Sequence, residues 1–94
     1  MWVYILANRR NGTIYTGVTN DLVRRIHQHR TRAVPSFTKR YDVTSLVWFT
    51  EYGDPETAIK REKAIKSWPR KWKLALIEKE NPEWRDMWND ISEP

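Results

Sequence analysis

The chain has 94 residues, with 17 Lys and Arg against 12 Asp and Glu, a formal net charge of +5 and no cysteine. This length suits one small domain and excludes a machine with separate recognition and catalytic modules. The lack of cysteine excludes disulfide scaffolds, thiol chemistry and cysteine-ligated zinc. We expect a single domain over residues 1–94, with a core over about 1–80 and a C-terminal helical turn in 81–94 that packs on it.

The first apolar run, residues 2–8, predicts a β-strand because it is continuous and rich in β-forming residues. It is too short for a signal peptide or a membrane span, so we expect a cytoplasmic protein, associated with the nucleoid if it binds DNA, and no membrane partner. The Asn11-Gly12 pair predicts a hairpin, since both residues tolerate a positive φ. Residues 13–18 are then the returning strand.

The first helix is expected from residue 22 to about 33, because Pro35 ends it. Asn20 or Thr19 is the expected N-cap, with Asp21 in the first turn, where a negative charge is favourable. At about 100° per residue, one stripe of this helix consists of Leu22, Ile26, His29 and Ala33.

A third strand is predicted over residues 43–52 and a second helix over 55–67, with Asp54 as N-cap and Pro55 in the first helical position. A further helix is expected over 70 to about 80. The residues expected to anchor it are Trp72, Ala75, Leu76 and Ile77.

The Asn81-Pro82 pair ends the helix over 70–80, and Trp84 and Trp88, four residues apart, are expected to pack a last helical turn onto the body. The predicted order is therefore β-β-α-β-α-α.

Glu62 occupies a position in the second helix where the apolar stripe of Ala58, Ile59 and Ile65 calls for a hydrophobic residue. A buried carboxylate is costly without a partner, so it should bind a metal, line a cleft or form a salt bridge. The salt-bridge partners that we considered are Arg25, Lys66 and Arg70.

His29 is the polar member of the stripe on the first helix, whereas His27 points away from it. A lone histidine there is either a core residue or a catalytic one, and Arg25 lies one turn earlier on the adjoining face. Tyr4 and Tyr15 lie across the predicted hairpin and can share one side of the sheet, as packing partners or as part of a site.

These residues together match the chemistry of phosphodiester hydrolysis. That reaction needs an activated water, a cation near the phosphate and, usually, a divalent metal held by carboxylate oxygen. Glu62 can hold Mg²⁺, Arg25 can contact the phosphate through two N–H groups, and a tyrosine or His29 can take a proton from water if nearby cations lower its pKa.

The sequence resembles the GIY-YIG endonuclease superfamily, and is most similar to its small stand-alone bacterial members, which are related to the nuclease domain of the excision-repair incision subunit. Residues 2–4 and 15–17 resemble the two strand motifs, residues 19–29 the helix with the family's arginine and histidine, and residues 58–68 the helix with its glutamate. Trp2 stands where the first motif has glycine, and Val18 where excision-repair members have lysine.

The resemblance implies an α+β fold, a three-stranded antiparallel sheet flanked by helices, and a site on one sheet face. It implies that Tyr15 is the general base or orients water, with Tyr4 as its neighbour and alternate. Arg25 would contact the scissile phosphate, His29 would assist proton transfer or phosphate binding, and Glu62 would hold one Mg²⁺ or Mn²⁺.

The expected function is that of a metal-dependent DNA endonuclease, structure-selective and linked to DNA repair or recombination, with a partner protein that supplies specificity. The alternatives are a nucleic-acid-binding module without strong activity and a small protein-interaction adaptor. The basic residues expected to contact DNA are Arg24, Arg32, Lys39, Arg40, Lys63, Lys66, Arg70 and Lys71.

Overall fold

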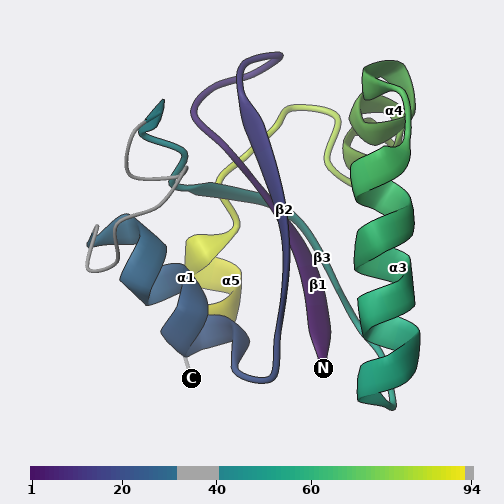
Figure 1. Cartoon of the computed structure of the whole chain (residues 1–94). Coiled ribbons are helices and arrows are strands. Elements are labelled where there is room, and N and C mark those ends of the chain that lie inside the picture. Colours follow the sequence, from purple (N-terminus) through teal and green to yellow (C-terminus); the bar gives the residue numbers. More distant parts are fainter. Residues whose placement is uncertain (32–40, 93–94) are drawn as a thin grey trace.

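The computed structural model describes residues 1–31 and 41–92 and contains one three-stranded antiparallel sheet in the order β2-β1-β3. Strand β1 (Trp2–Ala7) lies between β2 (Ile14–Thr19) and β3 (Ser45–Glu51). Helices α1 (Leu22–Arg30) and α5 (Trp88–Ser92) lie on one side of the sheet, and α3 (Pro55–Ser67) and α4 (Arg70–Glu80) on the other (Figure 1). The predicted α+β class and element order are confirmed.

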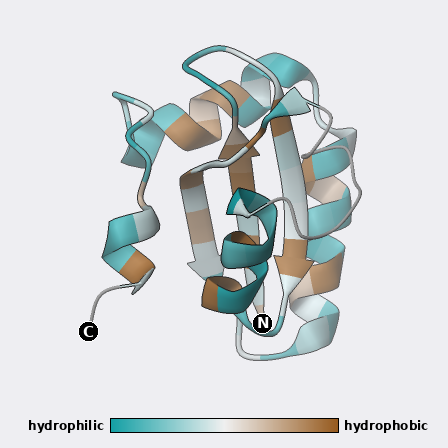
Figure 2. Ribbon diagram, turned by 90° about the vertical axis from the view of Figure 1, so that its left-hand side faces the viewer, coloured by the Kyte–Doolittle hydropathy of each residue, from teal (hydrophilic) through white to brown (hydrophobic). Residues whose placement is uncertain are grey.

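The central strand β1 is buried on both faces, which explains its continuous apolar sequence. Its side chains alternate between two hydrophobic clusters. Val3, Ile5 and Ala7 face α3 and α4, whereas Tyr4 and Leu6 face α1 and α5. In Figure 2, which views the molecule from the α1 side, hydrophobic residues lie along the strands behind the helix, and the outer turns are mostly hydrophilic.

A β-bulge in β3 aims two successive side chains at the same cluster. Ile5 pairs with Trp48 but Leu6 pairs with Leu46, so Val47 is the extra residue. As a result Val47 and Trp48 both pack in the cluster under α3 and α4, and Leu46 packs under α1.

The hairpin between β1 and β2 turns at Asn11, which has a φ of 57°. Asparagine adopts this left-handed conformation more readily than most residues, so the predicted turn is confirmed at this residue. Gly12 does not have a positive φ.

The first helix ends earlier than predicted, and its N-cap is a different residue. It ends at Arg30, with Thr31 as C-cap, and Ala33 and Pro35 lie outside the described residues. Asp21, expected in the first turn, is the N-cap, because its side chain accepts a hydrogen bond from the backbone N–H of Arg24. Neither Asn20 nor Thr19 caps this helix.

The second and third predicted helices match α3 and α4 in their bounds, but two of the assigned apolar faces were wrong. In α3, Asp54 is the N-cap as expected, whereas Ile59 is 38% exposed. In α4, Ile77 is buried, whereas Trp72 is 52% exposed and Ala75 is also exposed. One helix packed against a sheet needs only a narrow apolar stripe, so a wide stripe in the sequence does not show which side is covered.

The predicted pairing of Trp84 with Trp88 on one helical turn is wrong. Trp84 lies before α5 with a φ of 56°, and packs in the cluster under α3 and α4. Trp88 begins α5 and packs in the cluster on the α1 side. The chain therefore crosses from one side of the sheet to the other between these two residues.

Asp86 fixes this crossing. Its carboxylate accepts hydrogen bonds from the backbone N–H of Leu46 at 3.1 Å and of Trp88 at 3.0 Å. The same carboxylate forms an ion pair with Arg30 at 2.6 Å, which joins the C-terminal segment to the end of α1. Within the described residues, no helix has the length and hydrophobicity of a transmembrane segment.

Candidate active site

Three aromatic rings meet on the α1 side of the sheet. Tyr4 pairs with Gly17 in the β1–β2 register and Tyr15 pairs with Leu6, so both tyrosines project from the same face. His29 reaches them from the buried stripe of α1. The ring centroids of Tyr4 and Tyr15 are 6.3 Å apart, those of Tyr4 and His29 5.9 Å, and those of Tyr15 and His29 5.6 Å.

Gly17 lets the Tyr4 ring cross strand β2. A Cβ atom at Gly17 would lie 2.4 Å from both the Cζ atom and the hydroxyl oxygen of Tyr4, a distance at which atoms overlap. With only hydrogen at this position, the Tyr4 hydroxyl extends beyond β1 and shares a hydrogen bond of 3.1 Å with His29 Nε2. The lack of a side chain at Gly17 thus makes room for a tyrosine ring.

Burial sets the protonation of this pair. Burial raises the pKa of the Tyr4 hydroxyl far above its usual value, the nearby Tyr15 and Glu62 raise it further, and Arg25 opposes the shift. Burial, helped by the charge of Arg25, lowers the pKa of His29 to about 4. Both groups are therefore uncharged at neutral pH. The condition stated for a tyrosine as proton acceptor, a pKa lowered by nearby cations, is not met at Tyr4, because the effect of desolvation on its pKa outweighs that of Arg25.

Glu62 reaches the rings from the other side of β2. It lies on α3 and is 8% exposed, and its Oε2 atom is 2.7 Å from Lys66 Nζ. The same Nζ lies 5.7 Å from the centre of the Tyr15 ring. Both the Glu62 carboxylate and the Tyr15 ring therefore lie near the ammonium group of Lys66. Of the three salt-bridge partners considered for Glu62, the structure pairs it with Lys66.

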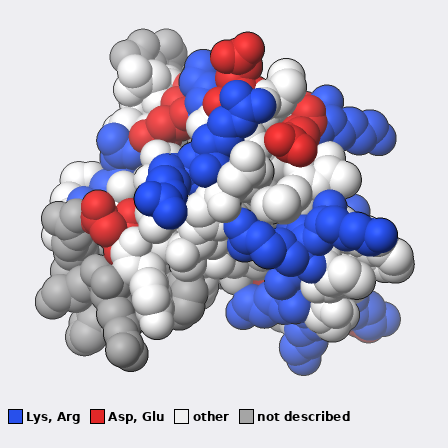
Figure 3. Space-filling view, turned by 90° about the horizontal axis from the view of Figure 1, so that it is seen from above, with Lys and Arg blue, Asp and Glu red and all other residues white. Residues whose placement is uncertain are grey.

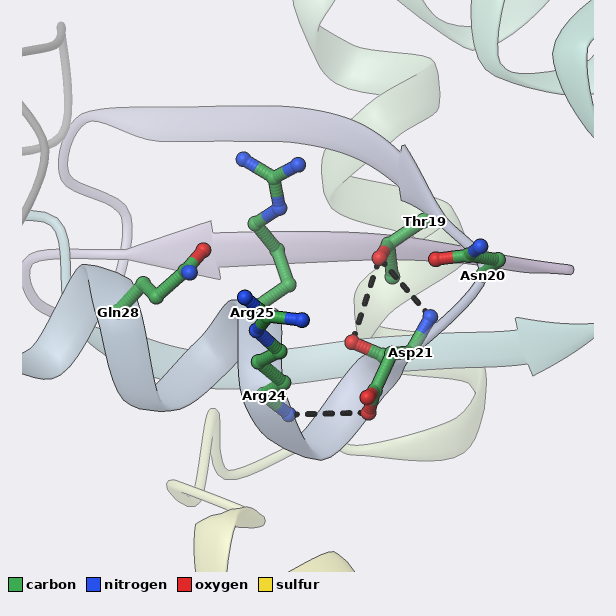
Figure 4. Close-up of a pocket in the computed structure, with 6 residues that line it drawn as sticks. All are labelled: Thr19, Asn20, Asp21, Arg24, Arg25 and Gln28. Atoms are coloured by element: carbon green, nitrogen blue, oxygen red, sulfur yellow. Dashed lines mark hydrogen bonds between the residues drawn. The ribbon is translucent and has the colours of Figure 1, made fainter.

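Arg25 lines a depression of about 500 Å³ at the start of α1 (Figure 4). The Asp21 carboxylate is engaged as the helix cap, and the Arg25 side chain extends away from α1 with its guanidinium group clear of the drawn hydrogen bonds. Arg25 and Glu62 both act on the pKa of Tyr4, so groups of opposite charge lie within electrostatic reach of one hydroxyl. The residues that line the depression are Thr19, Asn20, Asp21, Arg24, Arg25 and Gln28.

The basic residues expected to contact DNA fall in several places. Arg24 lies beside Arg25, Lys66 beside Tyr15, and Arg70 against the hairpin, where its guanidinium donates a 3.0 Å hydrogen bond to the carbonyl oxygen of Asn11.

The remaining basic residues lie away from the rings or outside the description. Lys63 and Lys71 are exposed on α3 and α4. Arg32, Lys39 and Arg40 lie outside the described residues.

Two cations near the site were missed. Arg9 and Lys73 line depressions next to Tyr15 and the hairpin. In the sequence Lys73 lies one helical turn after Arg70, and Arg9 comes just before the turn residues. These two positions are the only sequence signal for a role of Arg9 and Lys73. They indicate that the two residues share a surface only when α4 is known to pack beside the hairpin.

The carboxylate available to a metal at this site is that of Glu62. In the ranges 1–31 and 41–92, no group of three or more His, Asp or Glu side chains is placed to hold a metal ion by itself. A metal here would take one carboxylate from the protein and its other ligands from water and substrate, which is the usual arrangement for Mg²⁺ bound with phosphates.

Comparison with known proteins agrees with this arrangement. The model of the family described as "GIY-YIG catalytic domain" matches residues 1–75. A UPF0213 protein of Yersinia pestis is 31% identical over 77 residues, which cover 82% of this chain and 81% of that protein. A UPF0213 protein of Yersinia pseudotuberculosis matches to the same extent.

A solved structure gives the same result. The solution NMR structure of a UPF0213 protein of Bacillus halodurans superimposes with a TM-score of 0.57 at 27% identity, and the match covers 97% of this chain and 95% of that one. The family match, the sheet order and the meeting of the two strand motifs agree, and we conclude that this chain belongs to the GIY-YIG catalytic domain family.

Proposed function

We propose that this protein is a divalent-metal-dependent DNA endonuclease that hydrolyses phosphodiester bonds. The observation that carries the proposal is the meeting of Tyr4, Tyr15 and His29 with the carboxylate of Glu62 and the guanidinium group of Arg25. Those groups come from four different elements and gather around one strand. Membership of the GIY-YIG family supports the same chemistry.

Glu62 is the residue that would hold Mg²⁺ or Mn²⁺. Its carboxylate is largely buried yet retains some exposure, and carboxylate oxygens suit a hard cation. When bound, the metal supplies positive charge to the phosphate oxygens and makes a bound water more acidic. Lys66 shares the carboxylate, so a metal would compete with or displace this ammonium group.

Arg25 would bind the scissile phosphate. Its planar guanidinium group can donate two hydrogen bonds to two phosphate oxygens and stabilise the additional charge of the transition state. It lines an open polar depression, and Arg24 lies next to it. Lysine in place of Arg25 would retain the charge but lose the paired donors.

Tyr15 is the residue to which we assign the attacking water. Tyr4 is unsuited to accept a proton through an ionised hydroxyl, because burial raises its pKa and His29 shares its hydroxyl hydrogen bond. Tyr15 lies between the Tyr4–His29 pair and the Lys66 ammonium group. We assign to Tyr15 the orientation of the attacking water and, when its hydroxyl is ionised, the acceptance of the proton of that water. We assign to the His29–Tyr4 pair the positioning of the Tyr15 ring.

The proposal is tested by incubating the purified protein with branched, single-stranded and duplex DNA in the presence of Mg²⁺ or Mn²⁺. We expect cleavage of at least one substrate, and a loss of roughly 100-fold or more in Glu62→Gln and in Arg25→Ala, because each removes charge stabilisation worth several kcal/mol.

Glu56→Gln is the matched control for this test, since Glu56 lies on the same helix and pairs with Lys60 as Glu62 does with Lys66, but is exposed. Absence of cleavage on all substrates, or equal activity in Glu62→Gln and Glu56→Gln, would refute the proposal.

A nucleic-acid-binding module without catalysis is the second candidate, and the Glu62–Lys66 ion pair favours it because the carboxylate already has a cation partner. That candidate requires DNA binding that is unchanged in Glu62→Gln and no effect of Mn²⁺ on binding.

The nuclease proposal includes a role in DNA repair or recombination, a partner protein that supplies specificity and a cytoplasmic location. These parts of it rest on the family and on the net positive charge of the chain.

A further inference from the structure

A second basic depression lies beside the candidate site, between the β1–β2 hairpin and helix α4. It has a volume of about 470 Å³, and we call it the hairpin pocket. A smaller depression of about 220 Å³, which includes Tyr15 and Lys66, shares Ile14 and Lys73 with it, so the two adjoin. The residues that line the hairpin pocket are Arg9, Asn11, Gly12, Thr13, Ile14, Arg70 and Lys73.

The hairpin pocket is built from cations on two rigid elements. Arg70 donates hydrogen bonds to the carbonyl oxygens of Asn11 and Gly12, which hold the hairpin against the start of α4. Arg9 enters the pocket from the hairpin, and Lys73 enters from the next turn of α4. The two hydrogen bonds of Arg70 therefore join the two walls of the pocket.

The charge of the pocket is not neutralised locally. No Asp or Glu is among the described residues that line either depression. In the described part of the chain, neither Arg9 nor Lys73 forms an ion pair. Seen from above, Lys and Arg side chains form a broken band across the molecule, and most Asp and Glu side chains in this view lie in its upper half (Figure 3).

The hairpin pocket lies next to the candidate site. It shares Ile14 and Lys73 with the depression that contains Tyr15 and Lys66. A DNA strand that is cut beside Tyr15 and runs along β2 toward the hairpin therefore passes the hairpin pocket.

We propose that the hairpin pocket binds a backbone phosphate of the DNA on one side of the cut. This inference rests on the proposed function and adds a requirement to it. Substrate must extend past the cut on the side of the hairpin, and Arg9 and Lys73 are the residues that contact that extension.

The test measures the affinity of fluorescein-labelled duplex DNA by anisotropy at several salt concentrations, for the Arg9→Ala, Lys73→Ala and doubly substituted proteins. Each lost phosphate contact should reduce the magnitude of the slope of log K against log salt by about 0.9. Lys60→Ala removes an exposed lysine of α3 that pairs with Glu56, and is the matched control. Arg70 is left unchanged because it also holds the hairpin.

A second readout uses duplexes shortened by one nucleotide at a time on either side of the cut. Cleavage by the unsubstituted protein should fall once one side of the duplex becomes too short to reach the hairpin pocket, and the doubly substituted protein should lose this dependence. A salt slope equal to that of Lys60→Ala would overturn the inference.

The outcomes separate the two proposals. Cleavage that depends on Glu62, together with an unchanged salt slope in the Arg9 and Lys73 variants, would refute phosphate binding in the hairpin pocket and support the nuclease function. A reduced slope in a protein that cleaves none of the DNA substrates would retain the pocket as a phosphate-binding site and remove the nuclease.

Discussion

The two sides of the sheet are closed in different ways. The side under α3 and α4 is filled by an apolar cluster that includes Ile5, Ile65 and Trp84. The side under α1 and α5 has an apolar floor of Leu6, Ile26 and neighbours, but it also holds the hydrogen-bonded pair Tyr4–His29. The first side supplies packing. The second side has uncharged polar groups in place of some apolar side chains. The candidate site lies at strand β2, where groups from both sides of the sheet meet.

The comparison predicts that substitutions at two positions of α3, one helical turn apart, affect stability and activity separately. Ile65 is fully buried, so Ile65→Ala should lower the free energy of unfolding by about 2–5 kcal/mol. Glu62→Gln, three residues earlier, should change it by less than about 1 kcal/mol while it removes cleavage. Chemical denaturation of both variants measures the difference. An equal loss of stability in the two would place Glu62 in the packing core instead of the site.

The α1 side should become less stable in acid because of His29. Its pKa is about 4 in the folded protein and near 6.5 when unfolded, so the unfolded chain takes up a proton first as the pH falls. Stability present above pH 6.5 is lost between about 6.5 and 4, up to about 3 kcal/mol. Denaturation curves across this range should show the loss in the unsubstituted protein and not in His29→Gln.

His27→Gln is the control for that measurement, because His27 lies on the same helix and is exposed. If the two substitutions altered the pH dependence equally, the burial of His29 would not be its cause.

A smaller effect is expected where Tyr4 crosses β2. Gly17→Ala puts a Cβ atom against the Tyr4 ring and should cost about 1–3 kcal/mol of stability. It should also lower cleavage, since the ring must move away from His29. Gly53→Ala is the matched control, because a Cβ atom there would meet nothing within 4 Å. Thermal unfolding and a cleavage assay of both variants test this, and an active, stable Gly17→Ala would contradict the role of the close contact.

Local signals predicted the fold well where one residue type has one strong preference. Asp54-Pro55 predicted the start of α3, and Asn11 predicted the hairpin. His29 and Glu62 were found because each interrupts an apolar stripe, and burial of both is confirmed. A polar residue in an apolar stripe is costly to bury unless it has a partner or a function, which is why such a position can be recognised from the sequence alone.

Other features depend on how the elements pack and could not be predicted from the sequence. Trp72 and Ile59 belong to apolar stripes but face solvent, because the sheet covers only one side of each helix. The separation of Trp84 from Trp88 depends on the crossing fixed by Asp86. Lys73 lies near Tyr15 only because α4 packs beside the hairpin, and the sequence does not show this packing.

The ion pair between Arg30 and Asp86 extends the candidate site to a part of the chain that carries none of its groups. Helix α1 bears both Arg25 and His29, and its last residue is tied to Asp86, which also binds the backbone of β3. The family match ends at residue 75, so Asp86 lies outside the region that the chain shares with the family model, whereas Arg30 lies inside it. The end of the helix that bears Arg25 and His29 is therefore held in part by a residue of the C-terminal segment, and we expect substitution of Asp86 to shift both side chains.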